Sequence, residues 1–200
     1  DVAWSGSNDN FTFQYNQRGH QVYRIIRVNA ENGEVSLPID ESVKTFVDWT
    51  NKVYFRKVPK SGEAIWMSER DGWNHLYLYD FNQGKLKNQI TKGNWVVRNV
   101  TRVDEAKRQI WFQAGGIVSG QDPYYLHLCR VNFDGTGLTI LTEGDGNHTT
   151  AISPDGTCFV DTYSRVDMPP VTNLRSMANG SLIIALEKSD ATSLTATGWK

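Results

Sequence analysis

The chain has 200 residues, 12% of them aromatic, and a formal net charge of −1 at pH 7. A chain of this length can bury a core without disulfides or metals, and its aromatic content argues against disorder. The balanced charge offers no attraction for nucleic acid or an acidic membrane, so neither partner is expected. The longest apolar runs, such as LIIAL at 182–186, are far shorter than the roughly 18 residues of a membrane-spanning helix.

Four groups of strand-like runs follow one another along the chain. Each group has a first strand, a second strand after a looser turn, a third strand that runs into a tight turn with glycine, and a closing strand, with the period-2 alternation of β-structure. In chain order the first, second and closing runs are DVAW, NFTFQYN and EVSLPI; VYFRKV, AIWMSER and KLKNQIT; VVRNVTRV, QIWFQAG and LTILTEG; TTAISPDG, CFVDTYS and SLIIALE. No long stretch has helical periodicity, so the sequence predicts an all-β chain.

The four tight turns repeat at a nearly constant interval. Their glycines are 51, 51 and 45 residues apart, and glycine supplies the positive φ that a tight hairpin needs. They are Gly33, Gly84, Gly135 and Gly180. Four copies of a four-stranded antiparallel unit predict a β-propeller fragment, either a small closed ring or half of an eight-bladed one.

The expected blades span approximately 1–43, 44–93, 94–146 and 147–190. A β-sandwich is the alternative fold, but it does not require the same strand order and turn chemistry four times. The sequence SPDG at 153–156 supports the propeller, because it suits the turn between the inner two strands of a blade.

Cysteines and tryptophans are expected mainly in the interior. Cys129 and Cys158 stand in strand-like runs, and two small buried hydrophobic residues are favoured over a disulfide. The tryptophans expected to pack between blades, rather than to stack on sugars or bases, are Trp4, Trp66, Trp95 and Trp111.

No pattern typical of a catalytic, metal or cofactor site occurs. The four histidines are scattered, and C-x-x-C, H-E-x-x-H and the calcium-loop pattern are absent. The G-x-S-x-G pattern of a hydrolase nucleophile is also absent. We therefore expect no catalytic residue, no bound metal and no cofactor in this segment.

The strongest local cluster of polar residues lies between two predicted strands. It could form a charged ligand-binding loop or a structural corner joining the second and third strands of a blade, and the structural interpretation is favoured. Its residues are Ser68, Glu69, Arg70, Asp71, Gly72, Trp73, Asn74 and His75.

SERDGWNHLYLYD (68–80) followed by QITKGNWVV (89–97) resembles the S-E-R-D-G-x-x-H-L-Y and L-T-x-G-x-W-x-V blade of the dipeptidyl peptidase IV family, in the prolyl oligopeptidase clan. The likeness continues in family order through NFDGTGLTILTEGDGNHT (132–149), SPDGTCFVDTYSRVDMPPVTNLRS (153–176) and LEKSD (186–190). It covers nearly the whole chain, which makes it more specific than any single motif.

The resemblance implies the C-terminal half of the N-terminal propeller of a bacterial-type member, excised from a longer protein. Residues 191–200 would lead toward an absent α/β-hydrolase domain. Family members remove dipeptides from peptide N-termini after Pro or Ala. Their Ser, Asp and His triad lies in that domain, and their substrate-binding Glu pair lies on an earlier blade, so neither is carried over. The resemblance also suggests a periplasmic or secreted parent enzyme.

One stretch is expected near the substrate. FVDWT (46–50) loosely resembles the family segment that borders the substrate cavity, which makes Asp48 and Trp49 candidates for lining it. An ordinary strand entry is the alternative interpretation of this stretch.

We expect a non-catalytic propeller portion that gates access and positions peptides for a serine exopeptidase, and that is inactive alone. An independent protein-binding propeller of the TolB or WD-repeat type is the alternative. The expected partners are peptide substrates through the parent enzyme, the absent hydrolase domain and the earlier blades. A second copy of the chain is also expected, because an excised arc leaves blade faces open.

Overall fold

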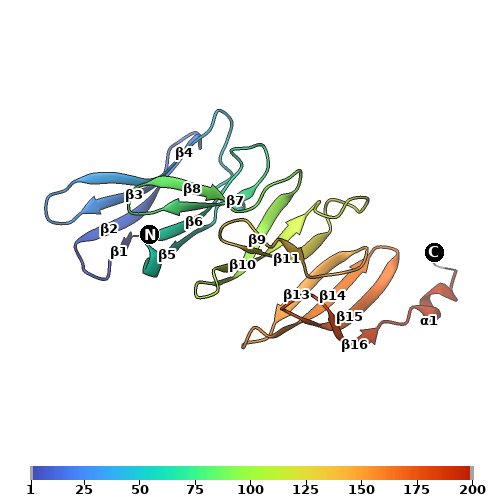
Figure 1. Ribbon diagram of the computed structural model, residues 1–200. Helices are drawn as coiled ribbons and strands as arrows, with labels where there is room; N and C mark the ends of the chain where they lie inside the picture. The colour runs from blue at the N-terminus through green and yellow to red at the C-terminus, as the bar shows by residue number, and fades with distance from the viewer. Residues whose placement is uncertain (1, 199–200) are drawn as a thin grey trace. The chain divides into compact units, whose positions relative to one another are not determined.

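The computed structural model describes residues 2–198 and is built almost entirely of β-strands (Figure 1). Four antiparallel sheets of four strands follow one another along the chain, and in each sheet the strands pair in sequence order. The prediction of an all-β chain of four four-stranded propeller blades is thereby confirmed. The chain divides into two compact units, with sheets 1 and 2 in the first and sheets 3 and 4 in the second.

The first unit holds the strands that precede residue 94. Sheet 1 consists of β1 (Val2–Trp4), β2 (Asn10–Asn16), β3 (Val22–Asn29) and β4 (Val35–Ser42). Sheet 2 consists of β5 (Phe55–Val58), β6 (Glu63–Ser68), β7 (His75–Asp80) and β8 (Lys85–Gln89), with a 3₁₀ turn at Pro59–Ser61.

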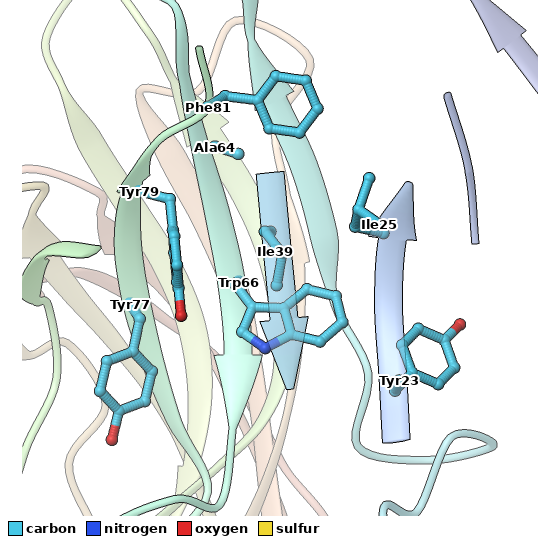
Figure 2. Close-up of a cluster of buried hydrophobic side chains, with 8 residues drawn as sticks. All are labelled: Tyr23, Ile25, Ile39, Ala64, Trp66, Tyr77, Tyr79 and Phe81. Carbon is cyan, nitrogen blue, oxygen red and sulfur yellow. The ribbon is translucent and has the colours of Figure 1, made fainter. Parts of the chain in front are cut away.

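Sheets 1 and 2 pack through a cluster of buried side chains (Figure 2). Sheet 1 contributes Tyr23, Ile25 and Ile39. Sheet 2, together with the residue that follows β7, contributes Ala64, Trp66, Tyr77, Tyr79 and Phe81. Trp66 is 1% exposed, and every residue of β6 is buried, because this strand has neighbours on both faces. Truncating such a buried aromatic residue costs roughly 3–5 kcal/mol, so this cluster is a main source of stability in the first unit.

The second unit holds the remaining two sheets. Sheet 3 consists of β9 (Val96–Asp104), β10 (Gln109–Gly115), β11 (Leu126–Asn132) and β12 (Thr139–Ile140). Sheet 4 consists of β13 (Asn147–Ile152), β14 (Cys158–Arg165), β15 (Met168–Ser176) and β16 (Leu182–Lys188). Trp111, Leu128 and Leu141 pack here against Phe159 and Met177.

Strand β12 is shorter than the predicted run LTILTEG. Its ladder pairs only two residues, Thr139 and Ile140, with β11. Beyond them the Thr142 hydroxyl accepts the hydrogen bond of the Leu128 N–H at 3.2 Å, so a side chain takes over from the backbone ladder. The strand pattern cannot show this substitution, because Thr is also a common strand residue.

The expected turn chemistry is present. The glycines of the four tight turns have φ values of 73°, 67°, 85° and 77° in chain order, and they are Gly33, Gly84, Gly135 and Gly180. Space at Gly180 is also restricted, because a Cβ there would lie 2.3 Å from the Leu141 carbonyl oxygen. The turn at 153–156 joins β13 to β14, with the Gly156 N–H donating to the Ser153 carbonyl at 2.9 Å.

The expectation for one tryptophan is wrong. Trp66, Trp95 and Trp111 are buried, whereas Trp4 is 57% exposed. Trp4 lies on β1, at the edge of sheet 1, where it contacts only the ring of Phe11 among the aromatic side chains of the described residues. A period-2 pattern gives the face of a strand but cannot show whether another element covers that face.

The remaining features of the second unit are a buried thiol and an exposed strand. Cys129 is buried, Cys158 is half-buried, and both are free thiols. All seven residues of β16 are exposed, including the apolar run LIIAL (182–186) of the predicted closing strand. The expected exit segment contains the short helix α1 (Thr192–Thr195), and its last two residues lie outside the described range. Association of two copies stays a prediction.

Candidate functional site

The SERDGW corner, residues 68–75, joins β6 to β7 in sheet 2. Strand β6 ends at Ser68 and β7 begins at His75, and these two residues face each other in the ladder. The turn between them starts with a hydrogen bond from the Gly72 N–H to the Glu69 carbonyl at 2.9 Å. Gly72 has φ 95°, a conformation that other residues rarely adopt.

A buried carboxylate from sheet 1 organises this corner. Glu41 at the end of β4 is 5% exposed, and its Oε1 accepts a 2.6 Å hydrogen bond from the Ser68 hydroxyl. Its Oε2 accepts a hydrogen bond from Trp66 Nε1 at 3.0 Å and another from the Arg70 guanidinium. Since a buried carboxylate is costly unless it is paired and hydrogen-bonded, this arrangement fixes sheet 2 against sheet 1.

The Arg70 guanidinium is also held from its other sides. Its Nε donates to the Ser68 hydroxyl oxygen at 3.0 Å, and its central carbon lies 4.6 Å from the centre of the Tyr77 ring. Burial raises the pKa of Tyr77, so the ring stays neutral beneath the cation. The Ser68 hydroxyl donates to Glu41 and accepts from Arg70, and the residue is only 4% exposed, so the hydroxyl serves the corner and is not accessible to a substrate.

The acidic residues of the corner make local bonds. Glu69 Oε1 accepts from Lys52 Nζ at 2.8 Å, a partly exposed ion pair. Asp71 Oδ1 accepts from the Trp73 N–H at 3.1 Å, and its Oδ2 accepts from Gln89 Nε2 at 2.5 Å. The Trp73 side chain is 41% exposed. These contacts tie the corner to the loop before β5 and to the end of β8.

His75 is fully buried and forms a clasp at the start of β7. Its Nε2 lies 3.0 Å from the Gly93 carbonyl, which can only accept, so Nε2 carries the proton. Its Nδ1 lies 3.0 Å from the Thr91 hydroxyl, and the same hydroxyl oxygen accepts from the Leu76 N–H at 2.9 Å. The imidazole thus fixes the segment that follows β8 against β7.

The second unit repeats this clasp in sheet 3. His127 Nδ1 lies 3.1 Å from the Thr142 hydroxyl, which accepts from the next N–H of β11, and His127 Nε2 donates to Gln121 Oε1 at 2.8 Å. Burial and the neighbouring ring of His148 lower the pKa of His127 to about 4. His127 is therefore neutral at pH 7, and both histidines are buried structural groups.

The predicted substrate-lining residues lie in the loop between β4 and β5. Asp48 Oδ1 accepts from the Thr50 hydroxyl at 2.8 Å and from the Asn51 N–H at 3.3 Å, and the Thr50 bond is the main cause that lowers the Asp48 pKa. The carboxylate thus forms a local turn within the loop. Trp49, by contrast, is 47% exposed.

An aromatic cluster surrounds Trp49, and we call it the aromatic face: His20, Phe46 and Trp49. The His20 ring stacks on Trp49 with centroids 6.0 Å apart and meets the edge of Phe46 at 5.3 Å. The Val47 N–H also donates to the His20 carbonyl at 2.7 Å, which fastens the loop to the β2–β3 turn. Half-exposed rings held by such contacts can contact a ligand at little entropic cost.

The cavity beside Asp48 is too small for a peptide. It measures about 20 Å³ and is lined by residues of the loop and of the corner, including Glu41, Val47, Asp48 and Ser68. That volume accommodates roughly one water molecule. Within the residues that the structure describes, no group of three or more His, Cys, Asp or Glu could hold a metal.

Sequence reasoning missed three residues of this site. Glu41 stands on β4 and His20 in the turn between β2 and β3, both in runs without a distinguishing motif. Thr91 had a detectable signal, because His-Leu is followed by Thr after 16 residues in one repeat and after 15 in the next. Aligning the repeats with each other would have revealed this clasp.

Sequential four-stranded antiparallel blades define this chain as a propeller protein. Its corner residues hold sheets 1 and 2 together, and the Ser68 hydroxyl among them is buried. The chain belongs to the dipeptidyl peptidase IV family, because the family model described as the dipeptidyl peptidase IV (DPP IV) N-terminal region matches residues 1–170.

Individual relatives agree with this assignment. Dipeptidyl peptidase 4 of Trichophyton rubrum is 27% identical over 176 residues, and that of Arthroderma otae is 25% identical over 174. Each match covers 84% of this chain and 22% of the relative, so the chain spans about a fifth of the length of these proteins.

Solved structures show the same fold. The crystal structure of Porphyromonas gingivalis dipeptidyl peptidase 4 gives a TM-score of 0.72 at 24% identity, over 98% of this chain and 26% of that one. A putative dipeptidyl aminopeptidase IV from Bacteroides ovatus gives 0.71 at 23% identity, over 95% and 29%. Within the described residues no helix is long and apolar enough to cross a membrane.

Proposed function

We propose that this chain is the non-catalytic propeller portion of a dipeptidyl peptidase IV-like serine exopeptidase, and that it gates access to the active site and positions peptides for cleavage of N-terminal dipeptides. The family match over residues 1–170 carries the proposal. It also favours this role over an independent binding propeller. By the same reasoning, the parent enzyme acts in the periplasm or outside the cell.

The aromatic face is the part of the first unit suited to positioning. Phe46 and Trp49 are each about half exposed, and their loop is fastened by the His20 contacts and by the Lys52–Glu69 pair. Aromatic side chains supply contact area for apolar peptide side chains. Because the cavity beside Asp48 has room for only about one water, the peptide would lie over the rings rather than inside this unit.

Kinetics of the parent enzyme test this role. Trp49→Ala should raise KM for peptide substrates several-fold and leave kcat nearly unchanged, because it removes binding that is equal in the ground and transition states. Trp73→Ala, which truncates a tryptophan of similar exposure on the neighbouring corner, is the matched control and should change neither constant. Equal effects of the two substitutions would contradict a positioning role.

The isolated chain provides a second test. Purified residues 1–200 should not hydrolyse a Gly-Pro chromogenic substrate, because the Ser68 hydroxyl of the corner is buried and already bonded to Glu41 and Arg70. Hydrolysis by this segment alone would refute the assignment of catalysis to another domain.

A further inference from the structure

A groove in the second unit is rich in hydrogen-bond donors. It measures about 410 Å³ and lies at the strand ends where β9 leads into β10 and β13 leads into β14. These ends are opposite to those that carry the 116–125 loop, the counterpart of the SERDGW corner in sheet 3. The volume suits a small-molecule ligand.

Arg102 contacts two groups of this groove. Its guanidinium lies over the Trp111 ring, 5.9 Å from the ring centre, and against the backbone of Gly156. A Cβ on Gly156 would approach the Arg102 guanidinium carbon to 2.6 Å, so glycine at this turn makes room for the cation. No side-chain or carbonyl acceptor within residues 2–198 bonds to this guanidinium, so its donors are unused.

Two more donors at the groove are buried without an acceptor in the described part of the chain. They are Trp111 Nε1 and Arg130 Nε. Arg130 uses another nitrogen, NH1, to donate to the Ala178 carbonyl at 2.6 Å. Uncompensated N–H dipoles leave positive partial charge beneath the groove, and an unpaired buried donor is normally costly.

The side chains that line the groove carry more positive than negative charge. Arg102, Lys107 and Arg130 supply three cations, against the two carboxylates Asp104 and Asp155. The Asp155 carboxylate already accepts from the Ser153 and Thr157 hydroxyls, and the Ser153 bond is the main cause that lowers its pKa. Cations and free donors therefore exceed the acceptors available to them.

We propose that this groove binds a small oxyanion, a carboxylate or a phosphate, with Arg102 as its main contact and Lys107 as a second. A planar guanidinium presents parallel N–H groups that match two oxygens of either ligand. The contacts with Trp111 and Gly156 place the cation at the groove, where it can meet a ligand. This site does not depend on the proposed peptidase role.

Nuclear magnetic resonance of the full 200-residue chain tests the proposal. Inorganic phosphate, added to ¹⁵N-labelled protein at constant ionic strength, should shift the Trp111 indole N–H signal and saturate with a Kd of about 1 mM or lower. Trp111→Phe assigns that signal among the seven tryptophans. No saturable shift with either phosphate or citrate would overturn the proposal.

Matched variants separate a built site from general charge. Arg102→Gln should weaken binding about tenfold or more and Lys107→Gln less, because charge-assisted bonds are lost. Arg98→Gln, on the same strand but exposed and outside the groove, should leave Kd unchanged. An equal loss in the Arg98 variant would refute the site.

Two ligands distinguish the source of the oxyanion. Titration with phosphate and with citrate, each against chloride at equal ionic strength, shows which oxyanion the groove prefers. Tighter binding of either one supports the proposal and identifies the ligand chemistry. A shift that chloride reproduces would reduce the effect to ionic screening and refute the proposal.

Discussion

Replacing Glu41 by Gln should destabilise the protein through the SERDGW corner. The amide keeps the shape of the carboxylate, and its oxygen can still accept from Trp66 and Arg70 if it takes the position of Oε2. Its NH₂ group then faces the Ser68 hydroxyl, which can no longer donate to it at 2.6 Å. The charge that balances Arg70 is lost at the same time.

The size of the effect follows from these contacts. A hydrogen bond to a charged group contributes about 1.5–3 kcal/mol, and breaking a fully buried ion pair costs about 3–5 kcal/mol. The Arg70 side chain is 28% exposed, so water screens part of the second loss. We expect a decrease in the free energy of unfolding of about 2–3 kcal/mol, which lowers Tm by roughly 5–10 °C for a chain of this size.

Urea unfolding followed by tryptophan fluorescence measures this change. Glu69→Gln is the matched control, because it makes the same chemical change on a partly exposed ion pair of the same corner and should cost less than about 1 kcal/mol. A Glu41→Gln protein within about 0.5 kcal/mol of the wild type, or one no less stable than the control, would show that the carboxylate does not organise the corner.

Three further predictions concern buried groups and turns. Because His127 has a pKa of about 4 when folded and near 6.5 when unfolded, the unfolded chain binds more protons between these values, so stability should fall as pH drops from about 6.5 to 4; His127→Gln should flatten this slope in pH-dependent urea unfolding. Gly180→Ala should cost about 3 kcal/mol or more, whereas Gly33→Ala, with similar φ but open space, should cost about 1 kcal/mol in thermal unfolding. Iodoacetamide should label Cys158 faster than Cys129, whose pKa is raised by burial, as mass spectrometry of the native protein can show; equal rates would contradict the burial.

Local signals predicted the fold because the strands and turns are locally determined. Alternation of side chains and positive-φ glycines specify a hairpin within a few residues, and the family resemblance gave the order of the blades. The exposure of Trp4 was not predictable in this way, since it depends on whether another element covers β1.

The candidate site was less predictable because its central contact joins two sheets. Glu41 lies 27 residues before Ser68, in a run whose alternation says only that one face is polar. This glutamate is important because it is only 5% exposed. Whether a residue is buried at a contact between two sheets depends on packing that the sequence of one strand does not encode. The SERDGW motif was visible in the sequence, but Glu41, the partner of Ser68 and Arg70, was not.

The polar residues that identify the family are largely occupied by contacts within the fold. Ser68 and Arg70 bond to Glu41, Glu69 pairs with Lys52, and His75 closes the clasp at the start of β7. Substitutions at these positions should therefore affect activity mainly through stability. In the proposed positioning role, a peptide has to be contacted by side chains that are not engaged in this way, and the half-exposed rings of the aromatic face meet that condition. A substitution in the aromatic face should for this reason change KM at unaltered Tm, whereas one in the SERDGW corner should change Tm first.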